Sequence, residues 1–343
     1  MNLPTNKKVS SQKLASVFNN TSATYKFYWF LAILDSIDEG VYEIDKKLLF
    51  SKMLSIPWYT INYFKISFGK QDLIQQSVQE IMDIENISIK LEIKGIADTL
   101  YNSTIKETLE ILKHFDNNVP HKFLSPWLGS GSKTSVYSGS QSFENDCMYA
   151  IYTDKIVISE NWKEYLKTNS GILKSFTYWN LSLFLQIRNS NVPNIPSKLI
   201  KPITRGSLSK HKSNYWDLVI DELEGVDCIY TGKKLYKKEY AVEHFVPYQY
   251  LVHDLMWNLV PADPSFNSFK GNKLPKIEDY FHNFYKTQEQ AFEIIKHYNS
   301  KNKFLEDYLP IIPDLKIKKE LMENYISPII KTAHNNGFQY LVI

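Results

Sequence analysis

Residues 241–247 read Ala-Val-Glu-His-Phe-Val-Pro, and this stretch decides how the C-terminal part of the chain is interpreted. An acidic side chain, Glu243, stands beside His244 in a run that otherwise has the apolar character of a strand. Neighbouring residues of an extended strand point to opposite faces, so one side chain can bind an ion while the other addresses a different part of a substrate. The stretch therefore predicts a strand that ends in chemically active residues.

Two asparagines follow this strand at set distances. Asn258 lies 14 residues after the histidine in Asp-Leu-Met-Trp-Asn-Leu-Val-Pro, and Asn267 lies 24 residues after the glutamate in Asn-Ser-Phe-Lys. Residues 264–271 are expected to form a short helix that brings Asn267 over the strand, with Lys270 one turn away. A carboxylate, an amide oxygen, phosphate oxygens and waters make the all-oxygen ligand set of Mg²⁺, and a neutral imidazole can deprotonate a water near neutral pH.

A polar turn precedes the strand. Thr231-Gly-Lys-Lys234 is followed by the strand-like run from Tyr240 to Val246. This order predicts a β-hairpin that ends at His244 and continues into a loop.

Four segments together resemble the HNH family of nucleases, which have the ββα-metal fold. They are Tyr-Thr-Gly-Lys at 230–233, Glu-His-Phe-Val-Pro at 243–247, Trp-Asn-Leu-Val-Pro at 257–261 and Asn-Ser-Phe-Lys at 267–270. The resemblance covers about residues 225–276 and is closest to HNH domains whose third motif residue is asparagine, including those of RNA-guided CRISPR nucleases. Each residue alone is more often a capping or hydrogen-bonding group than a catalyst, so the inference rests on their combination.

The resemblance implies a role for each residue. His244 is expected to be the general base that activates water, and Glu243 and Asn267 are expected to hold one divalent ion, Mg²⁺ or Mn²⁺. Asn258 is expected to pin the loop and orient the histidine, and Lys270 to stabilise charge that develops on the phosphate. The ion would act as a Lewis acid, and the products are expected to carry 5′-phosphate and 3′-hydroxyl ends.

Composition limits the remaining alternatives. The 343 residues are 43% hydrophobic, which predicts a folded protein of two or three domains, and the formal net charge of +3 does not by itself indicate a nucleic-acid partner. Cys147 and Cys228 are the only cysteines, and Thr231 stands where many HNH relatives have the second cysteine of a zinc motif, so neither a disulfide framework nor a structural zinc is expected. No apolar run approaches the length of a membrane span, so we expect a soluble, cytoplasmic protein without a membrane partner.

The expected fold class is α+β. We expect five parts: a mainly helical N-terminal region at 1–125, a small mixed α/β segment at 126–190, a linker at 191–214, the ββα-metal HNH nuclease module at 215–300 and a helical tail at 301–343.

Capping residues and apolar spacing predict individual elements. Ser22 is expected to cap a helix over Tyr25–Ile37, Asp45 to cap another that ends before Pro57, and further helices are expected near 71–82 and 104–115. The aromatic side chains of the Tyr25–Ile37 helix are interpreted as core and not as a base-stacking surface. We also expect strands at 148–152 and 156–158. A helix is expected at 171–188, with Ile172, Phe176, Trp179 and Leu183 on one face, and a final helix at 316–335, interrupted by Pro328.

Gly131-Ser-Lys-Thr134 superficially resembles a phosphate-binding loop. The P-loop pattern requires glycine directly before the lysine and a strand upstream, whereas here Ser132 precedes Lys133 and Pro126 breaks the upstream segment. A surface loop is therefore expected.

Basic residues near the linker could track a phosphate backbone, although a solvated linker explains them equally well. The nucleic-acid-binding candidates are Lys201, Arg205, Lys210, Lys212 and Lys273. His253 is interpreted as a surface residue.

The sequence therefore predicts a metal-dependent DNA endonuclease, with restriction or anti-phage defence as the hypothesis for its role. The N-terminal region is expected to bind the target, a partner protein or a regulatory ligand. An RNase or nicking enzyme and a catalytically weak nucleic-acid-binding module are the alternatives. One active site cuts one strand at a time, so double-strand cleavage in one binding event would require a homodimer.

Overall fold

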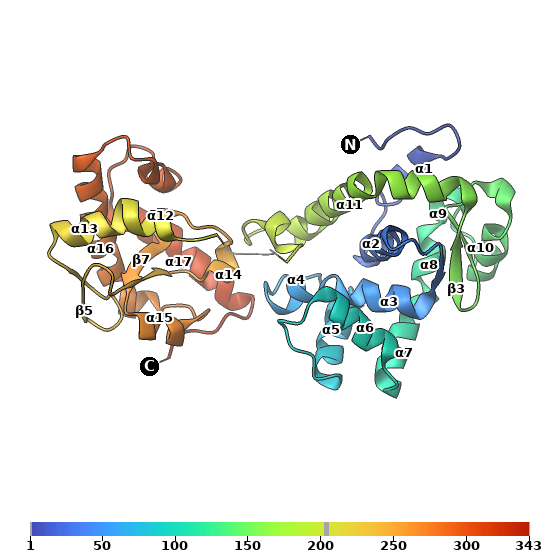
Figure 1. Ribbon diagram of the computed structural model, residues 1–343, viewed down its shortest axis with the longest axis horizontal. Coiled ribbons are helices and arrows are strands. Elements are labelled where there is room, and N and C mark those ends of the chain that lie inside the picture. The colour runs from blue at the N-terminus through green and yellow to red at the C-terminus, as the bar shows by residue number, and fades with distance from the viewer. Residues whose placement is uncertain (1, 202–205, 343) are drawn as a thin grey trace. The chain divides into compact units, whose positions relative to one another are not determined.

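The computed structural model describes residues 2–201 and 206–342 and divides the chain into two compact units (Figure 1). The first consists of Met1–Asn189 and Ile195–Lys201, and the second of Ser190–Asn194 and Pro202–Ile343. The protein is 58% helical with small sheets of two to three strands, which confirms the α+β class. The division falls inside the segment expected to be a linker, where Arg205 lies outside the described residues.

Helix α2, Tyr25–Asp38, is the core of the first unit and packs against α3, Lys46–Ser55, and α11, Glu160–Arg188 (Figure 1). Its aromatic side chains from Phe27 to Phe30 are all buried, which confirms that this helix is core. The expected cap was wrong, because Thr24 and not Ser22 occupies the N-cap position, without a side-chain capping bond.

Two other helix starts follow the expected chemistry. The Asp45 carboxylate accepts a hydrogen bond from the Leu48 amide at the start of α3, as predicted. Asp72 caps α5, Leu73–Ile84, by accepting from the Ile74 amide. The other α-helices described in this unit are α1 Ser11–Ser16, α4 Trp58–Asn62, α6 Ile93–Asn102, α7 Lys106–His114, α8 Val119–Phe123, α9 Ser125–Leu128 and α10 Lys133–Ser140.

A three-stranded antiparallel sheet lies in the same unit, with the order β1-β3-β2. Its strands are β1 Glu43–Asp45, β2 Tyr149–Ile151 and β3 Lys155–Ile158, so both strand-like runs of the sequence are confirmed.

Helix α11 is longer than expected, and the face named from the sequence is only partly buried. Of its four residues, Phe176 is buried and only 4% exposed, whereas Ile172, Trp179 and Leu183 are about half exposed, at 51%, 52% and 50%. Leu173 and Leu185, which lie outside this set, are fully enclosed, so apolar residues on several sides of the helix make periodicity a weak guide to its buried face.

The second unit contains four short strands. They are β4 Val226–Asp227, β5 Lys234–Leu235, β6 Ala241–His244 and β7 Leu259–Ala262. The expected hairpin was wrong in its pairing, because β4 pairs with β5 across the Gly232 turn while β6 pairs with β7. The two-residue strands β4 and β5 form backbone hydrogen bonds with each other. The longer β6 pairs instead with β7, which follows it in the sequence.

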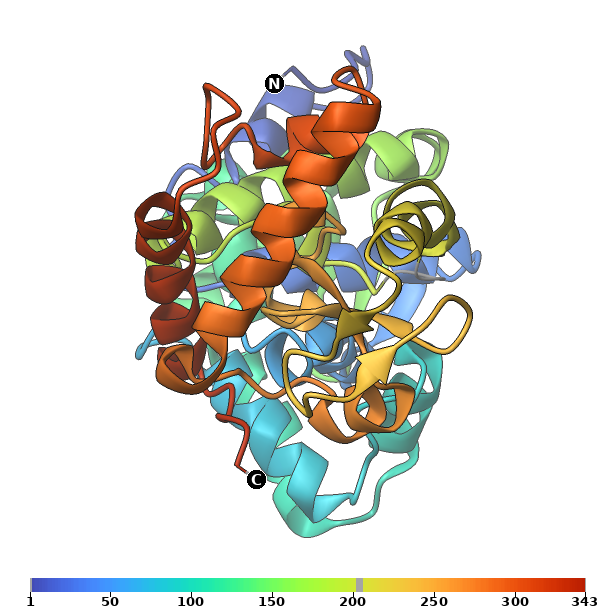
Figure 2. The same ribbon diagram turned by 90° about the vertical axis from the view of Figure 1, so that its left-hand side faces the viewer.

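Helices surround these strands. They are α12 Ser209–His211, α13 Asp217–Glu222, α14 Tyr248–Leu251, α15 Pro264–Lys270, α16 Ile277–Tyr298 and α17 Lys319–Asn335, with a π-helical turn at Lys212–Trp216. Helix α15 matches the short helix expected at 264–271, and α16 runs across this unit in Figure 2.

The last helix, α17, was expected to be interrupted by Pro328 but is continuous through it. Gly337, with a φ of 92°, follows the C-cap residue Asn336 of this helix. The chain then forms a β-bridge between Tyr340 and Leu274. Across residues 2–201 and 206–342, no helix combines the length and apolar character needed to cross a membrane.

Candidate active site

The β6–β7 pair fixes the backbone of the site. Glu243 lies opposite Val260 and His244 opposite Leu259, and both polar side chains are largely buried. The next residue, Phe245, stacks on Phe284 of α16 with ring centroids 3.9 Å apart. This packing anchors the strand end, so Glu243 and His244 lie on a paired strand and not on a loop.

The His244 ring is held by a carboxylate. Its Nε2 lies 2.8 Å from Oδ1 of Asp254, and the two side chains are 6% and 24% exposed. A neutral imidazole that donates Nε2–H to this carboxylate has Nδ1 as its acceptor. The carboxylate also stabilises the ring electrostatically when the ring takes up a proton.

Asn258 lies just before β7 and is fully buried. Its side-chain oxygen accepts from the Val246 amide at 2.8 Å, and its Nδ2 donates to the Val246 carbonyl at 2.8 Å. The Phe245 amide donates to the Asn258 carbonyl, also at 2.8 Å. These three bonds fix the segment that directly follows the histidine.

Glu243 is paired with a lysine inside the protein. The Lys270 ammonium lies 2.5 Å from Oε1 of Glu243 and donates to the His244 carbonyl at 2.9 Å, and the lysine has no exposed surface. Burial lowers the pKa of Lys270, and the adjacent Glu243 carboxylate opposes that shift. The sequence interpretation placed Lys270 at the substrate phosphate, whereas here its ammonium is bonded to Glu243.

Helix α15 carries the lysine to this position. Asp263 caps the helix by accepting from the Ser265 and Phe266 amides, and it pairs with Lys233 at 2.7 Å. The Asp263 amide donates to the sulfur of Cys228 at 3.4 Å. Cys228 therefore contacts the start of α15.

Comparison with known proteins agrees with this local geometry. Residues 228–276 match the model of the HNH endonuclease family. The matched segment begins at Cys228 and contains the whole constellation from Glu243 to Lys270, and it supports a nuclease. No curated protein and no solved structure matches the chain significantly.

The HNH segment supplies few metal-ligating groups. Within the described ranges, no cluster of three or more His, Cys, Asp or Glu side chains could hold an ion. Asn267 is half-buried on α15, and its side chain makes no hydrogen bond to another described residue. The Glu243 carboxylate and the Asn267 amide oxygen are hard donors that suit Mg²⁺, which usually keeps several waters. The donor chemistry therefore fits a divalent ion, with Lys270 competing for the carboxylate.

Asp254 was not identified from the sequence as part of the HNH site. It lies ten residues after His244 in the run Tyr-Leu-Val-His-Asp-Leu-Met-Trp, where an isolated carboxylate among apolar residues was the available signal. His253 is half-buried and not fully at the surface: its Nδ1 accepts from the Leu255 amide, and its ring lies 5.6 Å from that of Trp257.

The basic candidates in the described ranges belong to both units, and most of them already have a hydrogen-bond or ion-pair partner. Lys201 belongs to the first unit and pairs with Glu92 at 2.8 Å. In the second unit, Lys212 donates to the Tyr240 carbonyl at 2.9 Å and Lys273 to the Phe269 carbonyl at 3.3 Å. Lys210 is exposed in α12. A role of these lysines in phosphate binding stays a prediction.

Proposed function

We propose that the HNH segment is a divalent-metal-dependent endonuclease that hydrolyses phosphodiester bonds in DNA. The observation that carries the proposal is the bond between His244 and Asp254 at the end of β6, one residue from the buried Glu243. Hydrolysis by an activated water needs a general base in a fixed position and, for metal assistance, an oxygen ligand for the ion beside it.

His244 is the proposed general base. With Nε2–H directed at Asp254, its Nδ1 accepts the proton of the attacking water. The Asp254 carboxylate holds the ring in one orientation and stabilises the imidazolium that forms. Asn258 contributes by fixing Val246, which keeps the backbone after the histidine from shifting during the reaction.

Glu243 and Asn267 are the proposed ligands of one divalent ion, Mg²⁺ or Mn²⁺. The ion supplies Lewis-acid stabilisation of the charge that develops on the phosphate. Lys270 balances the Glu243 charge within the protein, and engagement of an ion by Glu243 requires the carboxylate to be shared with, or released by, this lysine.

The substrate class and biological role are further parts of the proposal. A role in restriction or anti-phage defence in the cytoplasm is consistent with a nuclease segment joined to a large helical unit, which we propose binds the target, a partner protein or a regulatory ligand. An RNA substrate is the alternative, because a one-metal site contacts the phosphate and not the base.

Cleavage assays on matched substrates test the proposal. The full chain is incubated with supercoiled plasmid, and with single- and double-stranded oligonucleotides of one sequence in DNA and RNA form, in Mg²⁺, Mn²⁺ or EDTA. We expect nicked or linear plasmid and DNA fragments with 5′-phosphate ends in either metal and none in EDTA. Linear product without a nicked intermediate indicates a homodimer. Cleavage of RNA alone, or cleavage that persists in EDTA, would contradict the proposal.

One observation favours a second candidate, a catalytically weak nucleic-acid-binding module. Lys270 occupies an oxygen of Glu243 and is itself fully enclosed. A protein whose metal carboxylate stays neutralised in this way retains DNA in a gel shift and forms no product even at high metal concentration. Product formation under those conditions rejects this candidate.

A further inference from the structure

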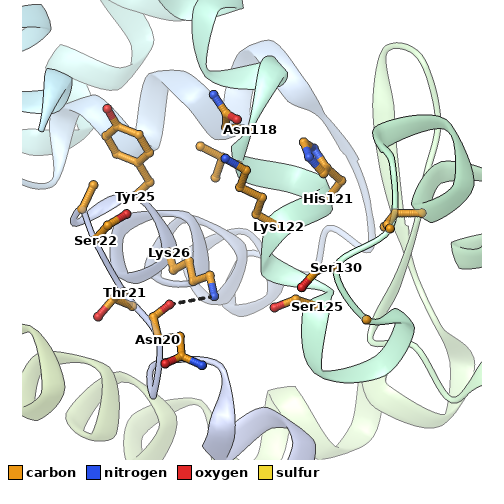
Figure 3. A pocket seen from close by; sticks show the side chains of 15 residues that line it. Asn20, Thr21, Ser22, Tyr25, Lys26, Asn118, His121, Lys122, Ser125 and Ser130 are labelled. Atoms are coloured by element: carbon orange, nitrogen blue, oxygen red, sulfur yellow. Dashed lines mark hydrogen bonds between the residues drawn. The ribbon is translucent and has the colours of Figure 1, made fainter. Parts of the chain in front are cut away.

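A cavity in the first unit lies far along the sequence from the HNH segment and has the chemistry of an anion site (Figure 3). Its volume is about 420 Å³, which is within the range of small-molecule pockets. It lies between the start of α2, helix α8 and the Gly129–Gly131 loop before α10. The start of α2 thus meets two segments much further along the chain, α8 and the loop that follows it closely, to build one pocket.

The lining of the cavity contains cationic side chains and no carboxylate. Lys26, Lys122 and His121 all line it, and Figure 3 shows Lys26 on one helix, α2, and Lys122 and His121 on another, α8. Among the described residues, the Lys26 ammonium donates to two backbone carbonyls, those of Val17 and Asn20. No ion pair joins Lys26 or Lys122 to an acidic group in the described part of the chain. Two positive charges are therefore available to an anion.

Two carboxylates outside the lining act electrostatically on lining residues, Asp116 on His121 and Asp72 on Tyr25, and both are engaged in other contacts. Asp116 binds Lys46 at 2.8 Å and Lys133 at 3.0 Å, and Asp72 accepts from the Thr24 amide at 2.6 Å. These contacts leave the positive charges of the cavity uncompensated by its own walls.

His121 adds a buried polar atom. The residue is 9% exposed, and its Nδ1 has no hydrogen-bond partner within residues 2–201 and 206–342. Burial lowers the pKa of His121, and the nearby charges of Lys122 and Lys133 add to this effect. A bound anion would oppose that shift, because it stabilises the protonated ring.

The Gly-Ser loop takes part without being a P-loop. Ser132 caps α10 by accepting from the Ser135 amide, and Lys133 is held by Asp116, so neither can act as a P-loop residue. Gly129 has a φ of 73° and space around it, and Ser130 lies at the opening opposite Lys122 (Figure 3). The wall therefore offers hydroxyl and backbone groups at the edge of a positively charged cavity.

We propose that this cavity binds the phosphate group of a phosphorylated ligand through Lys26, Lys122 and His121. The phosphate is carried either by a free nucleotide-sized molecule or by the end of a nucleic-acid strand. Charge-assisted hydrogen bonds from lysine and imidazole give such a group its affinity, and the hydroxyl groups of the wall orient it. This site is separate from the HNH constellation, and its test does not depend on cleavage.

Binding to the full chain is measured by calorimetry at constant ionic strength, with inorganic phosphate, a nucleoside triphosphate and a 5′-phosphorylated single-stranded oligonucleotide as probes. Lys122→Gln is the test variant because this lysine is exposed, and Lys94→Gln, an exposed lysine of the same unit outside the cavity, is the matched control. We expect about tenfold weaker binding in Lys122→Gln and no change in Lys94→Gln.

The probes distinguish the two sources of phosphate. Triphosphate binding that the oligonucleotide does not displace assigns a free small molecule, and preference for the phosphorylated oligonucleotide over its unphosphorylated form assigns a strand end. The proposal is overturned if the wild-type chain binds none of the probes, or if Lys122→Gln and Lys94→Gln bind equally well.

Discussion

Each unit of the protein buries a lysine against a carboxylate, and the two pairs differ in what surrounds them. In the first unit, Lys46 and Lys133 share Asp116, and the Tyr137 hydroxyl also donates to that carboxylate. In the second unit, Lys270 alone faces Glu243, beside His244. A buried ion pair is therefore not by itself evidence of a catalytic site, and our proposal for the second pair rests instead on the neighbouring His244 and on the spacing of the asparagines.

The pairs also differ in how replaceable each cation is. Asp116 keeps a second lysine if one is removed, and its side chain is 25% exposed. Glu243 has a single described lysine partner, and its side chain is 8% exposed. Loss of Lys270 would therefore leave an unpaired carboxylate charge in the interior.

The largest expected effect on stability follows from this difference. Lys270→Met should lower the free energy of unfolding by about 3–5 kcal/mol, because the Glu243 carboxylate loses its partner while buried. Lys46→Met should cost about 1–3 kcal/mol, since Lys133 still binds Asp116. Denaturant unfolding of both variants checks the order, and adding Glu243→Gln to Lys270→Met should recover part of the loss. Equal losses in the two single variants would contradict the comparison.

A smaller effect, on activity, is expected at Asp254. Asp254→Asn keeps the size of the side chain but can donate to His244 and favour the wrong tautomer, so the cleavage rate should fall about 10- to 100-fold with little change in unfolding. Asp254→Glu, which retains the carboxylate, should restore part of the rate. A rate equal to wild type in Asp254→Asn would remove Asp254 from the site.

The smallest effect concerns acid stability in the first unit. Burial alone would raise the pKa of Asp116, but hydrogen bonds from Lys46 and Lys133 lower it below its ordinary 3.8. A depressed carboxyl pKa gives stability that is present above the unfolded value and is lost as pH falls through the folded one. The stability difference between wild type and Asp116→Asn should therefore shrink as pH falls below about 4. Unfolding curves at several pH values measure it, and a difference that grows on acidification would be the contrary result.

Local chemistry explains which parts of this architecture could be predicted. The Asp45 cap, the short helix at α15 and the strands β2 and β3 depend on a few consecutive residues, and they were recognised. The β6–β7 pairing was not recognised. A strand's hydrogen-bonding partner depends on the tertiary fold, and the turn at Gly232 joins a different pair, β4 and β5. The buried face of α11 does not follow from periodicity, because apolar residues occur on several sides of this helix.

The candidate site shows the same limit. The spacing of Glu243, His244, Asn258 and Asn267 was readable as a resemblance, but the partners of their side chains were not. Asp254 contacts the histidine through a loop whose path no periodicity describes. Lys270 is expected from the resemblance to act on the substrate phosphate, and because lysine is rarely fully buried, its pairing with Glu243 inside the protein is visible only in the folded chain.

The central claim is that His244 activates water for phosphodiester hydrolysis, and one time course tests it most directly. Supercoiled plasmid is incubated in Mg²⁺ with the wild-type chain, with His244→Ala and with Lys46→Met, each shown to be folded by circular dichroism. We predict cleavage by wild type and Lys46→Met and a loss of about 10²- to 10⁴-fold in His244→Ala. Cleavage by His244→Ala at the wild-type rate would contradict the account.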